Sequence, residues 1–228
     1  NNENSIEFND DKFIMQEYIT GINLSSSVLA TECDAKTVTN TRLLTMNDFE
    51  KNNSFIYVGN ILPLTDKSIM AEVNDVNEIN QTMKETSEKL IRKFNLIGSN
   101  GVDYILNEKG LYVIEINPRI QGTFECVEKT FEINMLDAHI KSCQGEIINI
   151  PKPKYYSYKK IIYSPTRMKY HPLGLDNIYD LPHVGSITEK SQPLLTIIDR
   201  DKDFEKLCKK VELSSKKVNA ASRKYQQS

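Results

Sequence analysis

The chain contains 228 residues, of which 39% are hydrophobic and 26% are charged, and its formal net charge is -2. Such values are ordinary for a globular protein with a real core, and they disfavour nucleic acid or an anionic membrane surface as the main partner. No apolar stretch approaches the ~18 residues that span a bilayer, and no secretory signal opens the sequence. We therefore expect a cytoplasmic protein with one large domain or two small ones, and with no membrane or nucleic-acid partner.

In chain order, a polar segment at residues 1–12 precedes an apolar run at 13–19. The run predicts a mostly buried strand that ends at Thr20-Gly21. Because no earlier element is available to pair with this strand, the sequence indicates a fragment, or a chain whose first half has been left out.

Three further strands are predicted before the first helix, at residues 25–31, 36–44 and 55–58. Gly59-Asn60, with Pro63 soon after, predicts that the third strand stops and that a loop follows.

Residues 74–94 form the clearest predicted helix. Its apolar side chains recur at three- and four-residue steps or their multiples and leave the other faces charged: Val76, Ile79, Met83, Leu90 and Phe94. Asp75, with Glu78 three residues later, predicts a capping arrangement at the start of the helix. The stripe indicates core packing rather than a binding surface.

Residues 101–117 predict a β-hairpin around the loop Glu108-Lys109-Gly110, since a glycine that closes a three-residue loop fits a type I turn with a glycine bulge. Counting back from this loop places Asp103 directly opposite Glu115, and strand alternation turns Asn117 to the same face. The neighbouring side chains are expected to enter a core on the other face: Tyr104, Leu106, Tyr112, Ile114 and Ile116.

The later elements are shorter. A helix is predicted at 135–144, between an N-cap at Asn134 and Gly145. After Pro151 the chain is rich in Lys and Tyr and then alternates short apolar runs with Pro and Gly, which predicts a small β subdomain. Helical spacing returns at 201–225.

Four cysteines are scattered along the chain without a C-x-x-C pair: Cys33, Cys126, Cys143 and Cys208. Disulfide frameworks are typical of small secreted chains, so buried, reduced thiols are the simpler expectation. His139 and Cys143 lie four residues apart on a predicted helix and could contact one metal ion. Zinc sites use three or four ligands, and no others stand nearby in the sequence, so zinc is disfavoured.

The predicted hairpin carries the residues with the clearest chemistry. Two carboxylates that face each other repel unless a cation lies between them. Asp103, Glu115 and Asn117 offer oxygen ligands, which suit Mg²⁺, an ion that usually completes its shell with water and nucleotide phosphates. Arg119 follows Pro118, in a position to hold a phosphoryl group or a substrate carboxylate. The simpler alternative is a solvated acidic face with a surface arginine.

The run Glu115-Ile116-Asn117-Pro118-Arg119, with Asp103 twelve residues before Glu115, closely resembles the metal-binding hairpin of the ATP-grasp superfamily. Gln16-Glu17-Tyr18-Ile19-Thr20-Gly21 resembles the strand of that family that contacts adenine. Residues 181–193 resemble the small β subdomain of its carboxylase and carboligase branches. Uncharacterised archaeal-type carboligases are the branch that the sequence resembles most.

The resemblance implies an α+β fold. Residues 1–150 are expected to form the C-terminal part of an ATP-grasp domain, an antiparallel sheet with flanking helices. A small β subdomain would follow at 151–200 and a C-terminal helix at 201–228. The resemblance also assigns ATP binding to four residues: Gln16, Glu17, Tyr18 and Ile19. It assigns Mg²⁺, or Mn²⁺ in its place, to Asp103, Glu115 and Asn117, and a catalytic role to Arg119.

The favoured function is an ATP-dependent ligase that activates a small-molecule carboxylate as an acyl-phosphate for attack by an amine or a similar nucleophile. Its expected partners are therefore ATP and small carboxylate and amine substrates, with a homodimer as a further expectation. Two alternatives remain open: a carboxylase or carbamoyl-phosphate-type enzyme that uses bicarbonate, and a truncated paralogue without activity. The identity of the substrate is not readable from the sequence.

The sequence departs from the family pattern in two places. The glycine-rich loop and phosphate-binding lysines of the family lie upstream of the adenine strand, where this sequence has no room for them, so the nucleotide site is half present. Arg119-Ile120-Gln121 matches biotin carboxylase, but Gly122-Thr123-Phe124 replaces the Val-Glu-His run that follows there. Thr123 stands in place of the glutamate base toward bicarbonate, and Glu125 comes two residues late, so biotin-dependent carboxylation is disfavoured.

Overall fold

The computed structural model describes residues 16–49, 55–70, 73 and 75–226. The strands of this described part are β1 (Ile22–Ala30), β2 (Ala35–Thr45), β3 (Tyr57–Leu62), β4 (Gly98–Asn107), β5 (Gly110–Asn117), β6 (Tyr156–Tyr163), β7 (Met168–Lys169), β8 (Ile178–Tyr179), β9 (Ile187–Thr188) and β10 (Pro193–Asp201). Its helices are the short 3-10 helix η1 (Met46–Asp48) and the α-helices α1 (Val76–Lys93), α2 (Phe124–Phe131), α3 (Met135–Cys143) and α4 (Phe204–Lys224).

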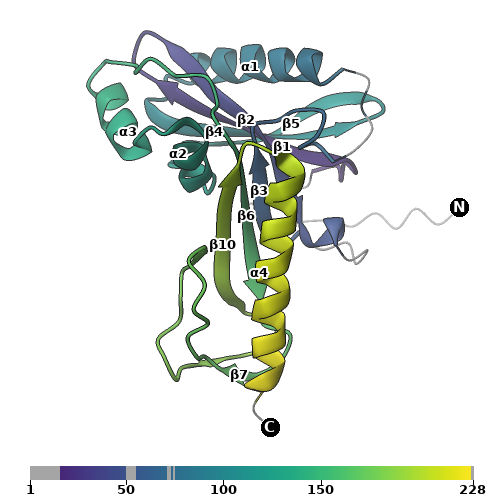
Figure 1. Cartoon of the computed structure of the whole chain (residues 1–228). Coiled ribbons are helices and arrows are strands. Elements are labelled where there is room, and N and C mark those ends of the chain that lie inside the picture. The colour runs from purple at the N-terminus through teal and green to yellow at the C-terminus, as the bar shows by residue number, and fades with distance from the viewer. Residues whose placement is uncertain (1–15, 50–54, 71–72, 74, 227–228) are drawn as a thin grey trace, which may run out of the picture.

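Eight of the described strands form one sheet in the order β5-β4-β1-β2-β3-β6-β10-β8, while β7 and β9 pair with each other. The neighbouring strands of the sheet run antiparallel. Figure 1 shows how far the sheet turns: β1, β2, β4 and β5 lie across the upper part of the view, and β3, β6 and β10 run downward from them. Strand twist accumulates in this way along a sheet of many strands. The expected α+β class with an antiparallel sheet and flanking helices is confirmed.

α1 covers one face of the upper part of the sheet (Figure 1). Met83 and Ile91, on one side of the helix, are fully buried in a cluster with Leu24 of β1 and Val102 of β4. The predicted cap is confirmed, because the Asp75 side chain accepts hydrogen bonds from the backbone N–H groups of residues 77 and 78. The predicted stripe is wrong only at its end, where Phe94 lies beyond the last helical turn and is exposed.

α2 and α3 pack on the opposite face of the sheet. Cys126, Phe131 and Met135 are buried there with Leu29 of β1 and Val38 of β2. The predicted N-cap of α3 is confirmed, since the Asn134 side chain accepts from the backbone N–H of residue 137. The two faces of β1 thus enter two separate cores, as strand alternation requires.

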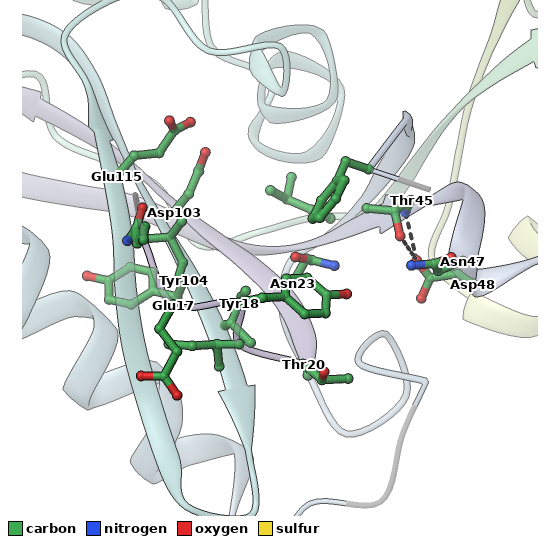
Figure 2. A pocket seen from close by; sticks show the side chains of 17 residues that line it. Glu17, Tyr18, Thr20, Asn23, Thr45, Asn47, Asp48, Asp103, Tyr104 and Glu115 are labelled. Atoms are coloured by element: carbon green, nitrogen blue, oxygen red, sulfur yellow. Dashed lines mark hydrogen bonds between the residues drawn. The ribbon is translucent and has the colours of Figure 1, made fainter. Parts of the chain in front are cut away.

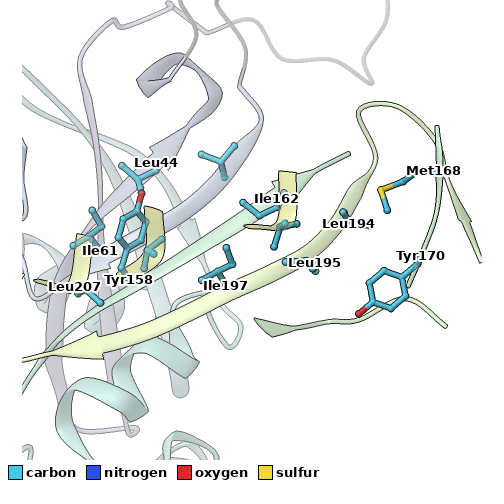
Figure 3. Close-up of a cluster of buried hydrophobic side chains, with 13 residues drawn as sticks. Leu44, Ile61, Tyr158, Ile162, Met168, Tyr170, Leu194, Leu195, Ile197 and Leu207 are labelled. Carbon is cyan, nitrogen blue, oxygen red and sulfur yellow. The ribbon is translucent and has the colours of Figure 1, made fainter. Parts of the chain in front are cut away.

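α4 lies along the lower part of the sheet and covers β6 and β10. Figure 3 shows the buried side chains of this third core, to which α4 contributes Leu207, β6 contributes Ile162 and β10 contributes Ile197. Leu207 and Ile197 are fully buried. The predicted helix at the C-terminal end is therefore packed against the sheet along its apolar side.

The predicted end of the third strand at residue 58 is wrong, and the loop begins only at Pro63. β3 continues to Leu62, and Gly59 lies inside the strand with a φ of 148°. A side chain at this position would collide with β6, because an ideal Cβ would stand 1.9 Å from the backbone oxygen of Lys159. Gly59 allows the close approach of β3 and β6 and does not end the strand.

The strand predicted at 13–19 is also wrong in its described part. Residues 13–15 lie outside the described residues, and 16–20 have no regular secondary structure. Gln16, Glu17 and Tyr18 are exposed. Apolar periodicity favours a strand only where a neighbouring strand supplies hydrogen bonds, and this segment precedes β1 without pairing to any described strand.

The residues after 151 share the sheet of the residues before it. β3 pairs with β6, β6 pairs with β10, and β8 completes that edge. The small two-stranded sheet of β7 and β9 is the part that stands apart. The division into 1–150, 151–200 and 201–228 stays a prediction. None of the described helices is long and apolar enough to cross a membrane.

Candidate active site

The β4–β5 hairpin places Asp103 directly opposite Glu115, and Gly101 opposite Asn117. The predicted register of the two carboxylates is therefore confirmed, but the path to it differs. Asn107 pairs with Gly110, so the loop holds two residues and not three. A β-bulge at Ile114 then supplies the missing residue and restores the pairing of Asp103 with Glu115.

The bulge also changes which side chains face the site. Ile114 was expected in the core, but it lines the same cavity as Asp103 and Glu115. Tyr112 was expected in the core as well, and it lines a neighbouring cavity with residues 17–20. An extra residue in one strand interrupts the simple alternation of faces, so counting by twos fails across it. Tyr104, on the regular strand, is buried as expected.

Asp103 is held from two sides. Ser25, its partner on β1, donates a hydrogen bond from Oγ to Asp103 Oδ1 at 2.6 Å, and Asn117 Nδ2 donates to Oδ2 at 3.0 Å. Burial, and to a smaller extent the nearby Glu115, raise the pKa of the Asp103 carboxyl to about 6, although the Ser25 hydrogen bond and the charge of Arg119 lower it. Two neighbouring carboxylates, one of them half-buried, repel each other, and a cation between them would relieve that repulsion.

Asn117 and Arg119 complete the predicted group. Asn117 Nδ2 also donates to Glu115 Oε1 at 2.8 Å, so its amide joins the two carboxylates. Arg119 is exposed, and its guanidinium donates to the backbone oxygen of Ile120 at 3.3 Å and to Asn117 Oδ1 at 3.5 Å. All four predicted metal and catalytic residues therefore lie in one continuous cluster.

The predicted ATP-binding segment lies beside this cluster. A cavity of about 610 Å³ is lined by Gln16, Glu17, Tyr18 and Ile19 together with Asp103 and Glu115. In Figure 2, Asp103 and Glu115 extend from neighbouring strands on one side of the cavity, Thr45 and Asp48 lie on the other, and Tyr18 lies between them. The Tyr18 ring meets the Phe55 ring edge to face, with centroids 5.5 Å apart, and both rings are exposed. Such rings offer apolar surface to a flat ligand.

A second cavity, of about 420 Å³, shares the two carboxylates with the first one and adds Arg119 and Tyr57. Asn60, which is fully buried, donates from Nδ2 to the Tyr57 oxygen at 2.6 Å. Burial raises the pKa of the Tyr57 phenol, so Tyr57 faces the cavity as a neutral hydroxyl. The two carboxylates thus stand between a larger cavity with exposed aromatic rings and a smaller one with a guanidinium.

Sequence reasoning missed Ser25, Tyr57, Phe55 and Gln121. Ser25 stands in a run of three serines inside an apolar strand, which is a signal for a polar face. Tyr57 and Phe55 fall in a predicted strand, but the direction of their side chains depends on the course of β3, which continues beyond the predicted end. Gln121 belongs to the run Arg119-Ile120-Gln121 that matches biotin carboxylase, but the sequence predicts no role for it.

Glu125 stands where an alternative base for bicarbonate would be sought. Both of its carboxylate oxygens accept from Lys159 Nζ, at 3.0 and 3.1 Å, and this lysine is buried. The Glu125 carboxylate is therefore engaged by a lysine, and the expectation that no base replaces Thr123 stays a prediction.

The cysteine expectation is half right. All four thiols are free, but Cys33 and Cys143 are exposed and only Cys126 is buried. His139 Nδ1 accepts from the backbone N–H of Ser99 at 2.9 Å, and the Cys143 sulfur lies 3.8 Å from Nε2. In the described part of the chain, no three His, Cys, Asp or Glu side chains gather as a metal site.

The residues of the hairpin fit Mg²⁺, an ion that is held in nucleotide sites by one or two carboxylates plus phosphates. Asp103 and Glu115 supply hard oxygen atoms from facing strands, and their mutual repulsion favours a cation. Asn117 turns its NH₂ group toward them, so its oxygen would bind a cation only after the carboxamide rotates.

Comparisons with known proteins identify the family of this chain. A family model described as an ATP-grasp domain matches residues 1–123. An uncharacterised protein of Methanocaldococcus jannaschii, MJ0776, is 26% identical over 88% of this chain and 46% of its own length. Tyramine–L-glutamate ligase of the same organism is 30% identical over 50% of this chain and 31% of its own length. The C-terminal section of the carbamoyl phosphate synthase large chain of M. jannaschii is 28% identical over 60% of this chain and 23% of its own length.

Solved structures show the same fold. The biotin carboxylase domain dimer of 2-oxoglutarate carboxylase from Hydrogenobacter thermophilus, in complex with MgADP, ADP and bicarbonate, has a TM-score of 0.61 at 16% identity and covers 84% of this chain and 44% of its own. Biotin carboxylase of Campylobacter jejuni, in complex with β,γ-ATP, has a TM-score of 0.66 at 14% identity and covers 87% and 46%. The chain spans less than half the length of these relatives. The family match extends over more than half of this chain, which therefore belongs to the ATP-grasp family.

Proposed function

We propose that the protein containing this chain is a Mg-ATP-dependent ligase that activates a carboxylate as an acyl-phosphate and transfers the acyl group to an amine. The observation that carries the proposal is the position of Asp103 and Glu115 between two cavities, one with the predicted ATP-binding segment and one with Arg119. With the nucleotide in one cavity and the acid in the other, the γ-phosphate and the acid carboxylate would meet beside Asp103 and Glu115. Neither substrate would have to change its position for the phosphoryl group to be transferred.

The nucleotide would occupy the larger cavity. Gln16, Glu17, Tyr18 and Ile19 would contact the adenine, and the exposed rings of Tyr18 and Phe55 would offer it apolar surface. Mg²⁺, or Mn²⁺, held by Asp103, Glu115 and Asn117, would neutralise the charge of the phosphates. Family membership and the MgADP complex of one structural relative support this arrangement.

The acid would occupy the smaller cavity. Its carboxylate oxygen attacks the γ-phosphorus, ADP leaves, and a mixed anhydride forms. The amine nitrogen then attacks the carbonyl carbon, and phosphate departs with the oxygen that came from the acid. Arg119 would hold the phosphoryl oxygens through both steps, because a guanidinium matches them with two parallel donors. The resemblance to tyramine–L-glutamate ligase, whose name describes such a ligation, favours an amine as the nucleophile.

Bicarbonate is the second candidate acceptor, favoured by the likeness to carbamoyl phosphate synthase and to biotin carboxylases. The pairing of Glu125 with Lys159 speaks against it, since it leaves no free glutamate at the position where a base toward bicarbonate would be needed. A paralogue without activity is the third candidate. A homodimer and a cytoplasmic location remain predictions.

Isotope transfer tests the proposal. The full-length protein is incubated with MgATP, an amine panel and acids that carry ¹⁸O in both carboxylate oxygens, in buffer freed of bicarbonate. Phosphate that contains one ¹⁸O atom, formed only with a particular acid, is the expected result. Phosphate release that requires bicarbonate and no other acid supports the second candidate. The absence of any Mg-dependent turnover across the panel supports the third.

A further inference from the structure

The turn between β5 and α2, residues 118–123, is braced by the side chain of Gln121. This side chain is 7% exposed, although it belongs to a turn. Its Nε2 donates to the backbone oxygen of Asn117 at 3.3 Å and to the backbone oxygen of Arg119 at 3.1 Å. One amide therefore ties together the backbone on both sides of Pro118.

The Gln121 side chain fits against β4 only because residue 101 of that strand is a glycine. An ideal Cβ at Gly101 would lie 2.1 Å from Cδ and from Oε1 of Gln121, far inside van der Waals contact. Gly101 pairs with Asn117 on one side and with Ser27 on the other. The amide of Gln121 is thus seated over the backbone of β4, two residues from Asp103.

The far end of the turn is held as well. Thr123 Oγ1 lies 3.1 Å from Ser27 Oγ, and the buried Lys159 donates from Nζ to the backbone oxygen of Gly122 at 3.2 Å. The backbone N–H of Phe124 donates to the backbone oxygen of Gln121 at 3.2 Å. The Arg119 side chain, by contrast, is exposed, and in the hydrogen bonds given above it donates only to the backbone oxygen of Ile120 and to Asn117 Oδ1. The aim of its guanidinium therefore depends on the backbone that Gln121 holds.

We propose that Gln121 is a positioning residue, which sets the metal ligand Asn117 and the phosphoryl ligand Arg119 at a fixed separation. The inference rests on the proposed function for the roles of those two residues. Gln121 also lines the smaller cavity, but both hydrogen bonds of its Nε2 go to backbone oxygen atoms, so we expect its loss to act through Asn117 and Arg119. Reacting groups that shift by about 1 Å lose as much as ~10²-fold in rate.

The first test replaces Gln121 by Met, which keeps the length of the side chain and removes both donors. In the metal-free full-length protein, we expect amide hydrogen exchange of residues 119–123 to become at least about tenfold faster while the strands of the sheet keep their protection. In the ADP complex, the affinity for Mn²⁺, followed by electron paramagnetic resonance, should fall by about three- to tenfold. Gln144→Met, at an exposed glutamine at the end of α3, is the matched control and should change neither quantity.

Kinetics separate positioning from a general loss of structure. With Gln121→Met, we expect kcat to fall by about 10- to 100-fold and the KM for ATP to stay within about twofold, because the predicted adenine segment is on another part of the chain. Gly101→Ala displaces the same amide from the opposite side without changing any polar group, and we expect it to reproduce all three effects. Gln121→Glu, which keeps the shape of the side chain, takes the place of Gln121→Met if that variant does not fold.

The proposal is overturned if a folded Gln121→Met protein shows unchanged exchange at 119–123, or faster exchange with wild-type Mn²⁺ affinity. Both readouts are made without turnover, so they decide the role of Gln121 even if the isotope experiment finds no ligase activity. A wild-type protein without activity would refute the proposed function, and unchanged Mn²⁺ binding in the Gln121 variant would refute the positioning role.

Discussion

The Asp103 carboxyl combines burial, a hydrogen bond from Ser25 and a nearby Glu115, and these do not act in the same direction. Burial and Glu115 raise its pKa, and Ser25 lowers it. The balance leaves the folded-state pKa near 6, above the ordinary value of 3.8. Without a cation, this site therefore binds a proton more tightly in the folded protein than in the unfolded chain.

A pH dependence of stability follows from that difference. A raised folded-state pKa stabilises the protein below the unfolded pKa, and this contribution is lost as the pH rises through the folded pKa. In EDTA, the unfolding free energy should therefore decline between about pH 4 and pH 6.5 by roughly 1–3 kcal/mol through Asp103. Asp103→Asn should flatten this decline and make the metal-free protein more stable than wild type at pH 7, as measured by urea unfolding across pH.

Asp66→Asn, at an exposed aspartate, is the control and should follow the wild-type curve. A wild-type curve that rises through this window, or an Asp103→Asn protein less stable at pH 7 in EDTA, would contradict the prediction. Saturating Mg²⁺ together with ADP should invert the order of the two proteins, because only the wild type retains both carboxylates for the ion.

Arg119 is expected to act on charge that develops during the reaction. Arg119→Ala should lower kcat by about 10²–10³, or roughly 3–4 kcal/mol, with little change in ATP binding. Arg119→Lys should recover only part of the rate, since an ammonium group cannot reproduce the planar two-pronged contact. Steady-state kinetics of the full-length enzyme, with ATP binding measured by calorimetry, provide the check.

Arg167→Ala is the control for Arg119→Ala. Arg167 makes an exposed ion pair with Glu189, and such pairs contribute ~1 kcal/mol or less to stability, so kcat should stay close to the wild-type value. An Arg119→Ala enzyme within about threefold of wild type would reduce Arg119 to the same status. The metal-binding hairpin would then be the part of the site that retains support.

A site residue can be predicted from the sequence when its partners lie close to it along the chain. Asp103, Glu115 and Asn117 belong to one hairpin, so turn chemistry and strand alternation bring them together. Ser25 touches Asp103 from 78 positions away, and Lys159 reaches Gly122 from 37 positions away. Such contacts depend on strand order in the sheet, which no local pattern specifies.

At the scale of the element, β3 shows how one glycine is interpreted in two ways. A glycine after an apolar run usually marks a turn, and Gly59 instead admits β6 to close contact. α1 and α3 are easier to predict, because Asp75 and Asn134 cap them with side-chain bonds that act within three residues, whereas α2 is not among the predicted helices. Segment 16–20 was predicted as a strand from its apolar character, which indicates a strand only when a pairing edge exists.

Gly59→Ala should be strongly destabilising. Its Cβ would stand 1.9 Å from the Lys159 oxygen, so the two strands must separate or the backbone must shift. We expect a loss of more than about 2 kcal/mol in unfolding free energy, measured by urea unfolding of the full-length protein. Gly122→Ala is the matched substitution, because an ideal Cβ there meets no atom within 4 Å. Equal stabilities of the two variants would disprove the close approach of β3 and β6.

At the scale of the whole molecule, one sheet connects three hydrophobic cores. α1, the pair α2 and α3, and α4 each cover a different part of it, and the hydrogen bonds between β3 and β6 join the upper and lower parts. Local periodicity predicted most of the strands but not their order, since β1 pairs with β4 across more than sixty intervening residues. The expected small β subdomain at 151–200 rests on a change in composition, and it stays a prediction.

The continuous sheet predicts cooperative unfolding. Leu207→Ala, in the core under α4, should cost about 2–5 kcal/mol, because the side chain is fully buried. If the sheet unfolds as one unit, native-state hydrogen exchange should show the same loss of protection in β1 and β4 as in β6 and β10. Leu213→Ala, at an exposed position of the same helix, should leave both regions unchanged. A loss confined to β6 and β10 would show two independently unfolding parts.

The bulge at Ile114 has a consequence for how such chains diverge. A two-residue loop followed by a bulge brings Asp103 and Glu115 face to face, and so would a three-residue loop followed by a regular strand. An insertion in the loop can therefore be offset by a deletion in the strand with no net change in chain length. Relatives compared by sequence alone should therefore keep the spacing between the two acidic positions, while the residues between them exchange roles between loop and strand. A change of that spacing by one residue would turn one carboxylate away from the other.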